Sequence, residues 1–241
     1  MSTSTVLILS VARTSDGLCL AGMATDPHPA SGLRWVRPIP ERGSLRMEDL
    51  TAAGGETIRP FDVVELNLLK PRPRPPHTED WIADFERERP RIVRRLEGER
   101  RSGFLQTYCD MAPRQVLEGQ QRSLCLIEAS SVTGSFRQDP SSAQLDARLS
   151  FRLGGRVYRG SYTKGGLAVT DLEWLALGAW WLPEGSGWAE LDEGLLEARL
   201  GIEQLFLVVG LSRSSLHRFE PVILGVHTVP EYEVPVSGET A

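Results

Sequence analysis

The chain has 241 residues, of which 41% are hydrophobic and 24% charged, as in an ordinary globular protein with one large or two small domains. Its net charge of -5 argues against a nucleic-acid-binding protein of the kind that is basic over its whole surface. An acidic protein can still bind nucleic acid through a local basic groove. The three cysteines are scattered and form no CxxC pair, which argues against a disulfide framework and for a reducing compartment. No apolar run approaches the roughly 20 residues of a membrane span, and the first run is too short for a signal peptide. We therefore expect a cytoplasmic protein with no membrane partner.

The first half is rich in strand patterns. Asp16-Gly17 separates two β-branched, apolar runs and predicts a hairpin between them. The proline cluster PRPRPP at 71–76 is expected to end a strand, and a short helix is expected over 45–53. The expected strands of this half cover residues 6–11, 18–24, 33–39, 61–69, 123–131 and 132–137.

Residues 77–122 interrupt these strands with many Arg, Glu and Gln residues and weak helical spacing, which predicts an inserted helical or irregular segment. The stretch QDPSSAQ at 138–144 has the composition of a linker or loop. Strand patterns then return over 145–153, 157–163, 203–211 and 221–229. A helix is expected over 171–181, with Thr170 as its N-cap and Glu173 completing a capping box. A second, acidic helix is expected over 190–200.

These elements predict a mostly β protein in two consecutive halves, each interrupted by a helical insertion. Short strands separated by Gly and Pro turns favour small barrels or sandwiches over a parallel α/β sheet. We expect a first barrel over 1–137, interrupted at about 77–122, and a second over 145–241, with its helices at about 171–200. Residues 138–144 would link them.

Several separated segments carry a resemblance to a known family. They are CLAG at 19–22, WVRPI at 35–39, FDVVEL at 61–66, SYTKGGLAVTDLEW at 161–174, and LFLVVGLSRS with RFEPVILGV over 205–226. In this order and spacing the chain resembles the dual OB-containing domain proteins of bacteria. The resemblance implies two OB-like barrels in tandem. It also implies a recognition module of nucleic-acid-centred bacterial conflict or defence systems, without an agreed enzymatic activity. The Arg-rich insertion departs from the family's pattern.

Motifs of catalysis and cofactor binding are missing from the sequence. It contains no GxxxxGK[ST], GxGxxG, GxSxG or HExxH. No carboxylate or cysteine is spaced to complete a metal site with His217 and His227. We therefore expect no catalytic residue, no metal and no cofactor. A metal-dependent nuclease or nucleotide hydrolase using Asp62 and Asp171 is a weaker alternative, because such sites need several convergent acids.

The segment around Trp35 is the first candidate ligand-binding site. Trp35 beside Arg34 and Arg37 on a barrel strand suits base stacking and phosphate pairing. The alternative is that Trp35 fills the core and Arg37 forms an ion pair, for example with Asp62 or Asp171.

A second candidate lies at the start of the expected helix. Tyr162 and Lys164 would line a pocket at the barrel mouth, beside Asp171 and Trp174. The alternative is that Asp171 caps the helix and Trp174 packs in the core. The aromatic set of Trp174, Trp180, Trp181 and Trp188 is typical of a core, and any exposed member would mark a partner surface.

The stretch 87–101 is a secondary basic patch, with seven arginines and three acids. Arg87, Arg91, Arg94 and Arg95 are the candidates there for holding a phosphate backbone. The alternative is a solvated helix face with i,i+4 pairs. Taken together, the sequence predicts a non-catalytic module that binds single-stranded nucleic acid or a nucleotide-derived ligand. A protein-interaction subunit that works with an effector partner is the other open possibility.

Overall fold

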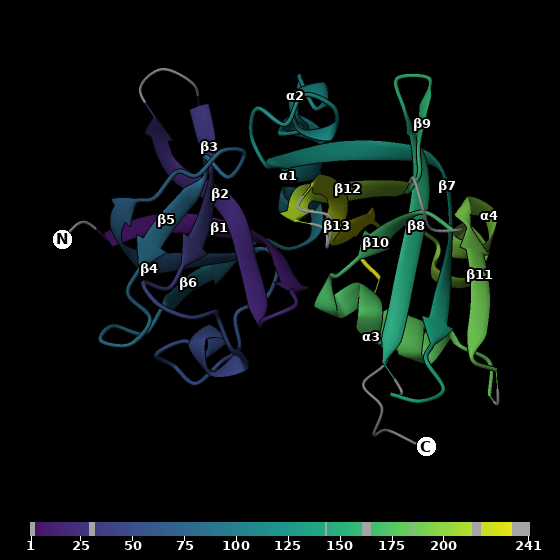
Figure 1. Ribbon diagram of the computed structural model, residues 1–241, viewed down its shortest axis with the longest axis horizontal. Helices are drawn as coiled ribbons and strands as arrows, with labels where there is room; N and C mark the ends of the chain where they lie inside the picture. The colour runs from purple at the N-terminus through teal and green to yellow at the C-terminus, as the bar shows by residue number, and fades with distance from the viewer. Residues whose placement is uncertain are drawn as a thin grey trace.

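The computed structural model describes residues 3–28, 32–142, 144–160, 165–184, 186–213 and 218–232, and these form two β-barrels side by side (Figure 1). The elements of the first half are β1 (Thr3–Arg13), β2 (Leu18–His28), β3 (Gly32–Ile39), the 3₁₀ turn η1 (Met47–Leu50), β4 (Asp62–Pro71), β5 (Asp80–Ala83), β6 (Arg91–Arg95), α1 (Gly98–Thr107) and α2 (Arg114–Leu117). Those of the second half are β7 (Leu124–Gln138), β8 (Leu145–Leu153), β9 (Arg156–Tyr158), β10 (Leu167–Val169), α3 (Leu172–Trp181), β11 (Trp188–Asp192), α4 (Glu193–Leu200), β12 (Gln204–Arg213) and β13 (Phe219–Val229).

The first barrel closes through five strands in the order β1-β2-β3-β5-β4, with β4 pairing back onto β1. Only the pair β3–β5 is parallel, and the other four pairs are antiparallel. Strand β6 adds to the outside of the ring along β4.

The second barrel repeats this plan in the order β7-β8-β10-β13-β12, and β12 pairs back onto β7. Its one parallel pair, β10–β13, occupies the same place in the ring as β3–β5. In both barrels the helical element, η1 or α3, follows the third strand of the ring. Two five-stranded barrels of this kind confirm the predicted mostly β, tandem OB-like fold.

The boundary between the barrels differs from the expected one. Residues 123–131 and 132–137, expected as two strands that finish the first barrel, form the single strand β7 of the second barrel. The stretch expected as a linker is instead the turn between β7 and β8, where the Asp139 N–H donates to the Gln144 carbonyl at 2.9 Å. A polar, Pro- and Ser-containing segment has the same composition in either role, so composition alone does not separate them.

The expected insertion at 77–122 contains β5, without which the first barrel would not close. Only four residues long, β5 shows no strand periodicity in the sequence, and its pairing with β3 and β4 defines it. Strand β6 and helices α1 and α2 follow, so the segment is only partly helical. The helix expected over 45–53 is reduced to the one turn of η1.

The expected helix over 171–181 is confirmed as α3, but its cap is different. Asp171, and not Thr170, accepts hydrogen bonds from the backbone N–H groups of Glu173 and Trp174. The acidic helix is shorter than expected, because residues 188–192 form β11 and only Glu193–Leu200 is helical. The return strand expected over 157–163 is β9, and residues 161–163 of that range lie outside the described residues.

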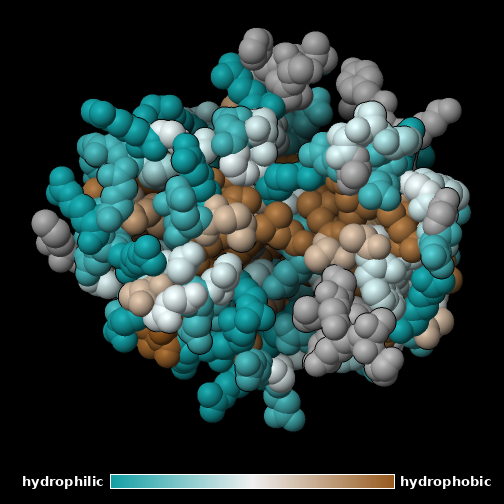
Figure 2. Space-filling model, turned by 90° about the horizontal axis from the view of Figure 1, so that it is seen from below, coloured by the Kyte–Doolittle hydropathy of each residue, from teal (hydrophilic) through white to brown (hydrophobic). Residues whose placement is uncertain are grey.

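Three apolar clusters account for the packing. One fills each barrel, and the third lies between the barrels. Strand β1 serves two of them, because Val6 and Ile8 point into the first barrel while Leu7 and Leu9 face the second. This explains why β1 is an uninterrupted apolar run. Viewed from below, hydrophobic residues run through the middle of the molecule, where the barrels meet (Figure 2).

Two β-bulges face each other across this interface. The pairing register shifts at Leu9 in β1 and at Leu224 in β13, which turns their carbonyl groups toward the opposite barrel. The Ser10 hydroxyl donates to the Leu224 carbonyl at 2.6 Å, and His227 Nε2 donates to the Leu9 carbonyl at 2.7 Å. These reciprocal bonds hold the barrels as one body.

His227 makes the stability of this interface depend on pH. Burial, together with nearby Arg101, lowers the pKa of His227 to about 3, whereas an unfolded chain would protonate it near pH 6.5. Stability is therefore lost as pH falls from about 6.5 toward 3, by about 2 kcal/mol between about pH 7.5 and about pH 5. Urea unfolding of wild type and His227→Gln at both pH values is expected to show this loss only in wild type. An equal change in both proteins would contradict it, because every other group titrates in both.

No helix in the described part of the chain is both long and apolar enough to cross a membrane.

Candidate ligand-binding site

A pocket of about 410 Å³ lies on the outer face of the first barrel, across β2 and β3. The β1–β2 turn closes one side of it, the segment after β3 closes another, and the β4–β5 connection closes a third. Its lining residues are Thr14, Leu18, Cys19, Arg37, Pro38, Ile39, Pro40, Glu41, Gly43, Ser44, Leu45, Arg72, Arg74 and Asp80.

Local sequence builds the walls of this pocket. The β1–β2 turn predicted at Asp16-Gly17 is present, and the Leu18 N–H donates to the Leu45 carbonyl at 2.8 Å. Gly17 is required there, because a Cβ on it would lie 2.3 Å from that carbonyl oxygen. In the β4–β5 connection, Arg74 and His77 exchange backbone hydrogen bonds of 2.9 and 2.7 Å around two prolines. These bonds fix the segment that carries the pocket's arginines.

An ion pair forms the floor of the pocket. Arg37 Nε donates to Asp80 Oδ1 at 2.6 Å, and the two residues are register partners of the parallel pair β3–β5. Burial acts to lower the pKa of Arg37, but its bond to Asp80 and the nearby carboxylates raise it overall. Burial raises the pKa of the neighbouring Cys19 thiol, so this cysteine stays protonated. The floor is therefore a neutralised pair beside an unreactive thiol.

Arg72 and Arg74 are the pocket's available cations. Arg72 is half-buried and Arg74 is exposed. Neither forms an ion pair with any residue that the structure describes. Among these residues, the Arg72 guanidinium makes only a long, 3.5 Å hydrogen bond, to the Glu41 carbonyl. Sequence reasoning missed both, because it used PRPRPP only as a strand terminator. Their position in the connection between two ring strands was the signal that would have found them.

The three candidate residues of the segment 33–39, Arg34, Trp35 and Arg37, have different surroundings in the structure. Arg37 lines the pocket, but with Asp80 as its partner in place of Asp62 or Asp171. Trp35 shares the outer face with Arg37, yet it is half-buried against the cluster between the barrels. The Arg34 guanidinium lies over the ring of Trp81, 4.6 Å from its centroid. One of the three therefore reaches the pocket.

Asp171 and Trp174 lie away from both open surfaces. Asp171 is 1% exposed, caps α3, and accepts a 2.6 Å hydrogen bond from the Val226 N–H. Burial, with nearby Glu173, raises the pKa of Asp171 to about 7, against the effect of its backbone donors. Trp174 is fully buried against Phe136. Their positions match capping and core packing. Tyr162 and Lys164 lie outside the described residues.

The Asp62–Asp171 pair proposed for hydrolysis is not assembled. Asp62 is fully buried and binds Arg95 through both oxygens, at 2.8 and 3.1 Å. Asp171 is occupied by the α3 cap, as described above. Within the described residues, no three His, Cys, Asp or Glu side chains group together as metal ligands.

The secondary basic patch is partly used within the fold. Arg91 and Arg95 lie on β6, not on a helix, and pair with Glu65 and Asp62 of the neighbouring strand β4. Arg87 and Arg94 are exposed and have no ionic partner in the described part of the chain. Arg87 lines a third pocket, of about 1000 Å³, which shares the segment after β3 (Pro40, Glu41, Gly43 and Ser44) with the lining of the first pocket.

A second pocket, of about 560 Å³, lies on the second barrel where β8, β9 and β10 meet the start of β13. Three arginines line it, Arg148, Arg156 and Arg159, together with Glu118 and Glu220. No sequence pattern singles out these arginines, because they flank an ordinary glycine hairpin at 154–155.

The four tryptophans of the second barrel divide into two groups. Trp174 and Trp181 belong to the core, whereas Trp180 and Trp188 are 46% and 52% exposed. Exposed tryptophans of this kind favour a contact surface on the second barrel.

Comparison with known proteins gives one family. A search of curated proteins finds no match to the chain. The sequence profile described as a dual OB-containing domain matches residues 4–173, which run from β1 through the first barrel to the start of α3. This range is most of the chain, and it includes both the first pocket and the β7–β10 portion of the second barrel. The chain belongs to the dual OB-containing domain family.

Proposed function

We propose that this protein is a binding module for single-stranded nucleic acid or a nucleotide-derived ligand, held in the first-barrel pocket. The observation that carries the proposal is the presence of Arg72 and Arg74, without ionic partners in the described residues, over a pocket on the β2–β3 face. OB-folds bind oligonucleotides on this face and the adjoining loops. Such a module would serve as the recognition component of a bacterial conflict or defence system.

The chemistry of the pocket suits a phosphate-bearing ligand. Its volume falls within the range of about 300–1,000 Å³ that is usual for small-ligand sites. The carboxylate of Asp80 is already neutralised by Arg37, so it repels an incoming phosphate little. Arginine forks bind phosphate oxygens in pairs. Because the whole chain is acidic, this attraction is local and is expected to weaken with salt.

Removing the charge of Arg72 and Arg74, the two pocket arginines without an ionic partner in the described residues, is expected to weaken binding about tenfold or more. The test is a fluorescence-anisotropy titration of labelled oligo-dT and oligo-U, about ten nucleotides long, at about 50 and about 200 mM salt. Arg72→Gln/Arg74→Gln is compared with Arg89→Gln/Arg100→Gln, which removes the same charge from exposed positions outside all three pockets described. Absence of salt-sensitive binding, or an equal loss in the control, would contradict the proposal.

A protein-interaction subunit is the second candidate, and exposed Trp180 and Trp188 favour it. The same titration separates the two. A wild-type protein that binds neither oligonucleotide leaves the tryptophan surface as the better-supported site, with an effector protein as its partner.

A further inference from the structure

The two pockets have matching charge. Each is lined by three arginines and two acids: Arg37, Arg72, Arg74, Glu41 and Asp80 in the first, and Arg148, Arg156, Arg159, Glu118 and Glu220 in the second. Both pockets are therefore net positive on a chain whose total charge is negative.

In the second pocket, as in the first, some arginines form ion pairs within the fold and others do not. Arg156 pairs with Glu118 at 2.8 Å, and Glu118 accepts the Tyr158 hydroxyl at 2.7 Å. Arg148 pairs with Asp146 at 3.0 Å. Arg159 is exposed and has no ion pair within the described ranges. Like Arg72 and Arg74, it remains open to an anionic ligand.

The pockets adjoin at the end of β1. The Arg13 N–H donates to the Thr170 carbonyl at 2.7 Å, where Thr14 lines the first pocket and Thr170 lines the second. The Arg13 side chain continues into the second barrel and donates to the Leu145 carbonyl at 3.1 Å. This backbone hydrogen bond therefore joins the edges of the two pockets, because Thr14 follows its donor and Thr170 is its acceptor.

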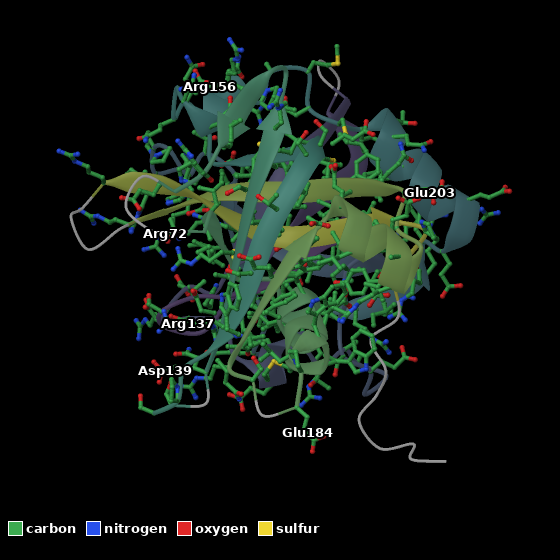
Figure 3. The ribbon with its side chains drawn as sticks, turned by 90° about the vertical axis from the view of Figure 1, so that its right-hand side faces the viewer. Arg72, Arg137, Asp139, Arg156, Glu184 and Glu203 are labelled. Atoms are coloured by element: carbon green, nitrogen blue, oxygen red, sulfur yellow. The ribbon has the colours of Figure 1, made fainter. Side chains whose placement is uncertain are left out.

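A second junction joins the loops beside the pockets. His77, in the connection that carries Arg72 and Arg74, packs edge-on against Phe219, with 5.3 Å between ring centroids. Phe219 directly precedes Glu220 of the second pocket. In Figure 3, Arg72 of the first barrel and Arg137 and Arg156 of the second lie toward the same side, and Glu203 lies on the opposite side. One lining arginine of each pocket, Arg72 and Arg156, therefore lies on the same side of the molecule.

The spacing of the pockets is fixed by buried bonds. Glu79, which follows this connection, is 7% exposed and accepts hydrogen bonds from the Ser123 N–H at 2.8 Å and the Leu124 N–H at 3.2 Å, at the start of β7. Together with the reciprocal bulge bonds, it prevents the barrels from turning independently. Two sites held at a fixed distance bind one long ligand more tightly than either site alone.

We propose that the two pockets form one continuous site, and that its ligand is a single strand of nucleic acid long enough to contact both barrels. This inference rests on the proposed function and narrows it, because a mononucleotide would fill only one pocket. With about four or more nucleotides per OB-fold, the strand spans about eight or more.

The test is a length series of labelled oligo-dT, from about four to about twelve nucleotides, against wild type, Arg72→Gln/Arg74→Gln and Arg159→Glu. Wild type is expected to bind the longest strand at least about tenfold more tightly than the shortest. Arg159→Glu is expected to remove most of this gain, whereas Arg100→Glu, a charge reversal on exposed α1, is expected to leave it.

The outcomes separate the two proposals. Equal affinity for all lengths, or a full length gain in Arg159→Glu, would overturn the continuous site while leaving the first pocket as the binding site. Failure of wild type to bind even the longest strand would overturn both. Circular dichroism of each variant shows whether a loss of binding is a loss of folding.

Discussion

Replacing Asp171 with alanine is expected to lower the free energy of unfolding by about 3–5 kcal/mol. The Asp171 carboxylate accepts hydrogen bonds from the backbone N–H groups of Glu173, at 2.9 Å, and Val226, at 2.6 Å. Alanine would leave these buried donors without an acceptor. It would also remove the cap of α3 and a link between α3 and β13.

Asp171→Asn is the matched control. Its side-chain oxygen still caps α3, but its NH₂ group would face the Val226 N–H, so a smaller loss of about 1–2 kcal/mol is expected. Wild type should also differ from both variants in the pH dependence of its stability, because only wild type carries the titrating carboxyl. Because the pKa of Asp171 is raised to about 7, its contribution is fully present below about pH 4 and is lost as pH rises through about 7.

Urea unfolding of both variants, alongside oligo-dT binding by the folded protein, checks this role. Unfolding is expected to change while affinity stays at the wild-type value, because Asp171 lines neither pocket. A stable Asp171→Ala protein that has lost oligonucleotide affinity would return Asp171 to the ligand site.

Replacing Trp174 with alanine is expected to destabilise the protein by about 3–5 kcal/mol. The side chain is fully buried, with the ring of Phe136 centred 5.7 Å away and that of Tyr232 5.8 Å away. Alanine would leave a cavity between α3 and the barrel that these rings are too constrained to fill.

Trp174→Phe separates volume from polarity. The indole Nε1 is buried and has no acceptor among the described residues. Phenylalanine removes that donor while keeping most of the ring, so a loss of about 1 kcal/mol is expected. Thermal unfolding followed by near-UV circular dichroism measures both variants. Equal losses for Phe and Ala would mean that the indole N–H has an essential partner.

Local signals predicted much of the fold. Asp16-Gly17 and Gly154-Gly155 mark real hairpins, the latter with φ of 54° and 80°, which glycine adopts without strain. The apolar pattern of α3 and the proline that follows it set its limits correctly. These features depend on neighbours within a few residues, which is the range over which turn chemistry and periodicity act.

Features that depend on distant partners escaped prediction. Strand β5 exists because β3 and β4 lie on either side of it, and four residues carry no periodicity of their own. The same pairing brings Asp80 beside Arg37 across 43 residues of chain, so the ion-pair partner was misassigned. The pocket could not be predicted for the same reason. Arg72 and Arg74 lie in the β4–β5 connection, and the position of that connection depends on the pairing of the strands in the first barrel.

The apolar face between the barrels has a consequence for separating one barrel from the other. A fragment ending after β6 would present Leu7, Leu9, Met23, Phe61 and Val63 to water, all of them at most 5% exposed in the intact chain. A surface of that kind promotes aggregation. The chain repeats one topology twice, yet each barrel covers an apolar face of the other, so we expect either barrel produced alone to aggregate.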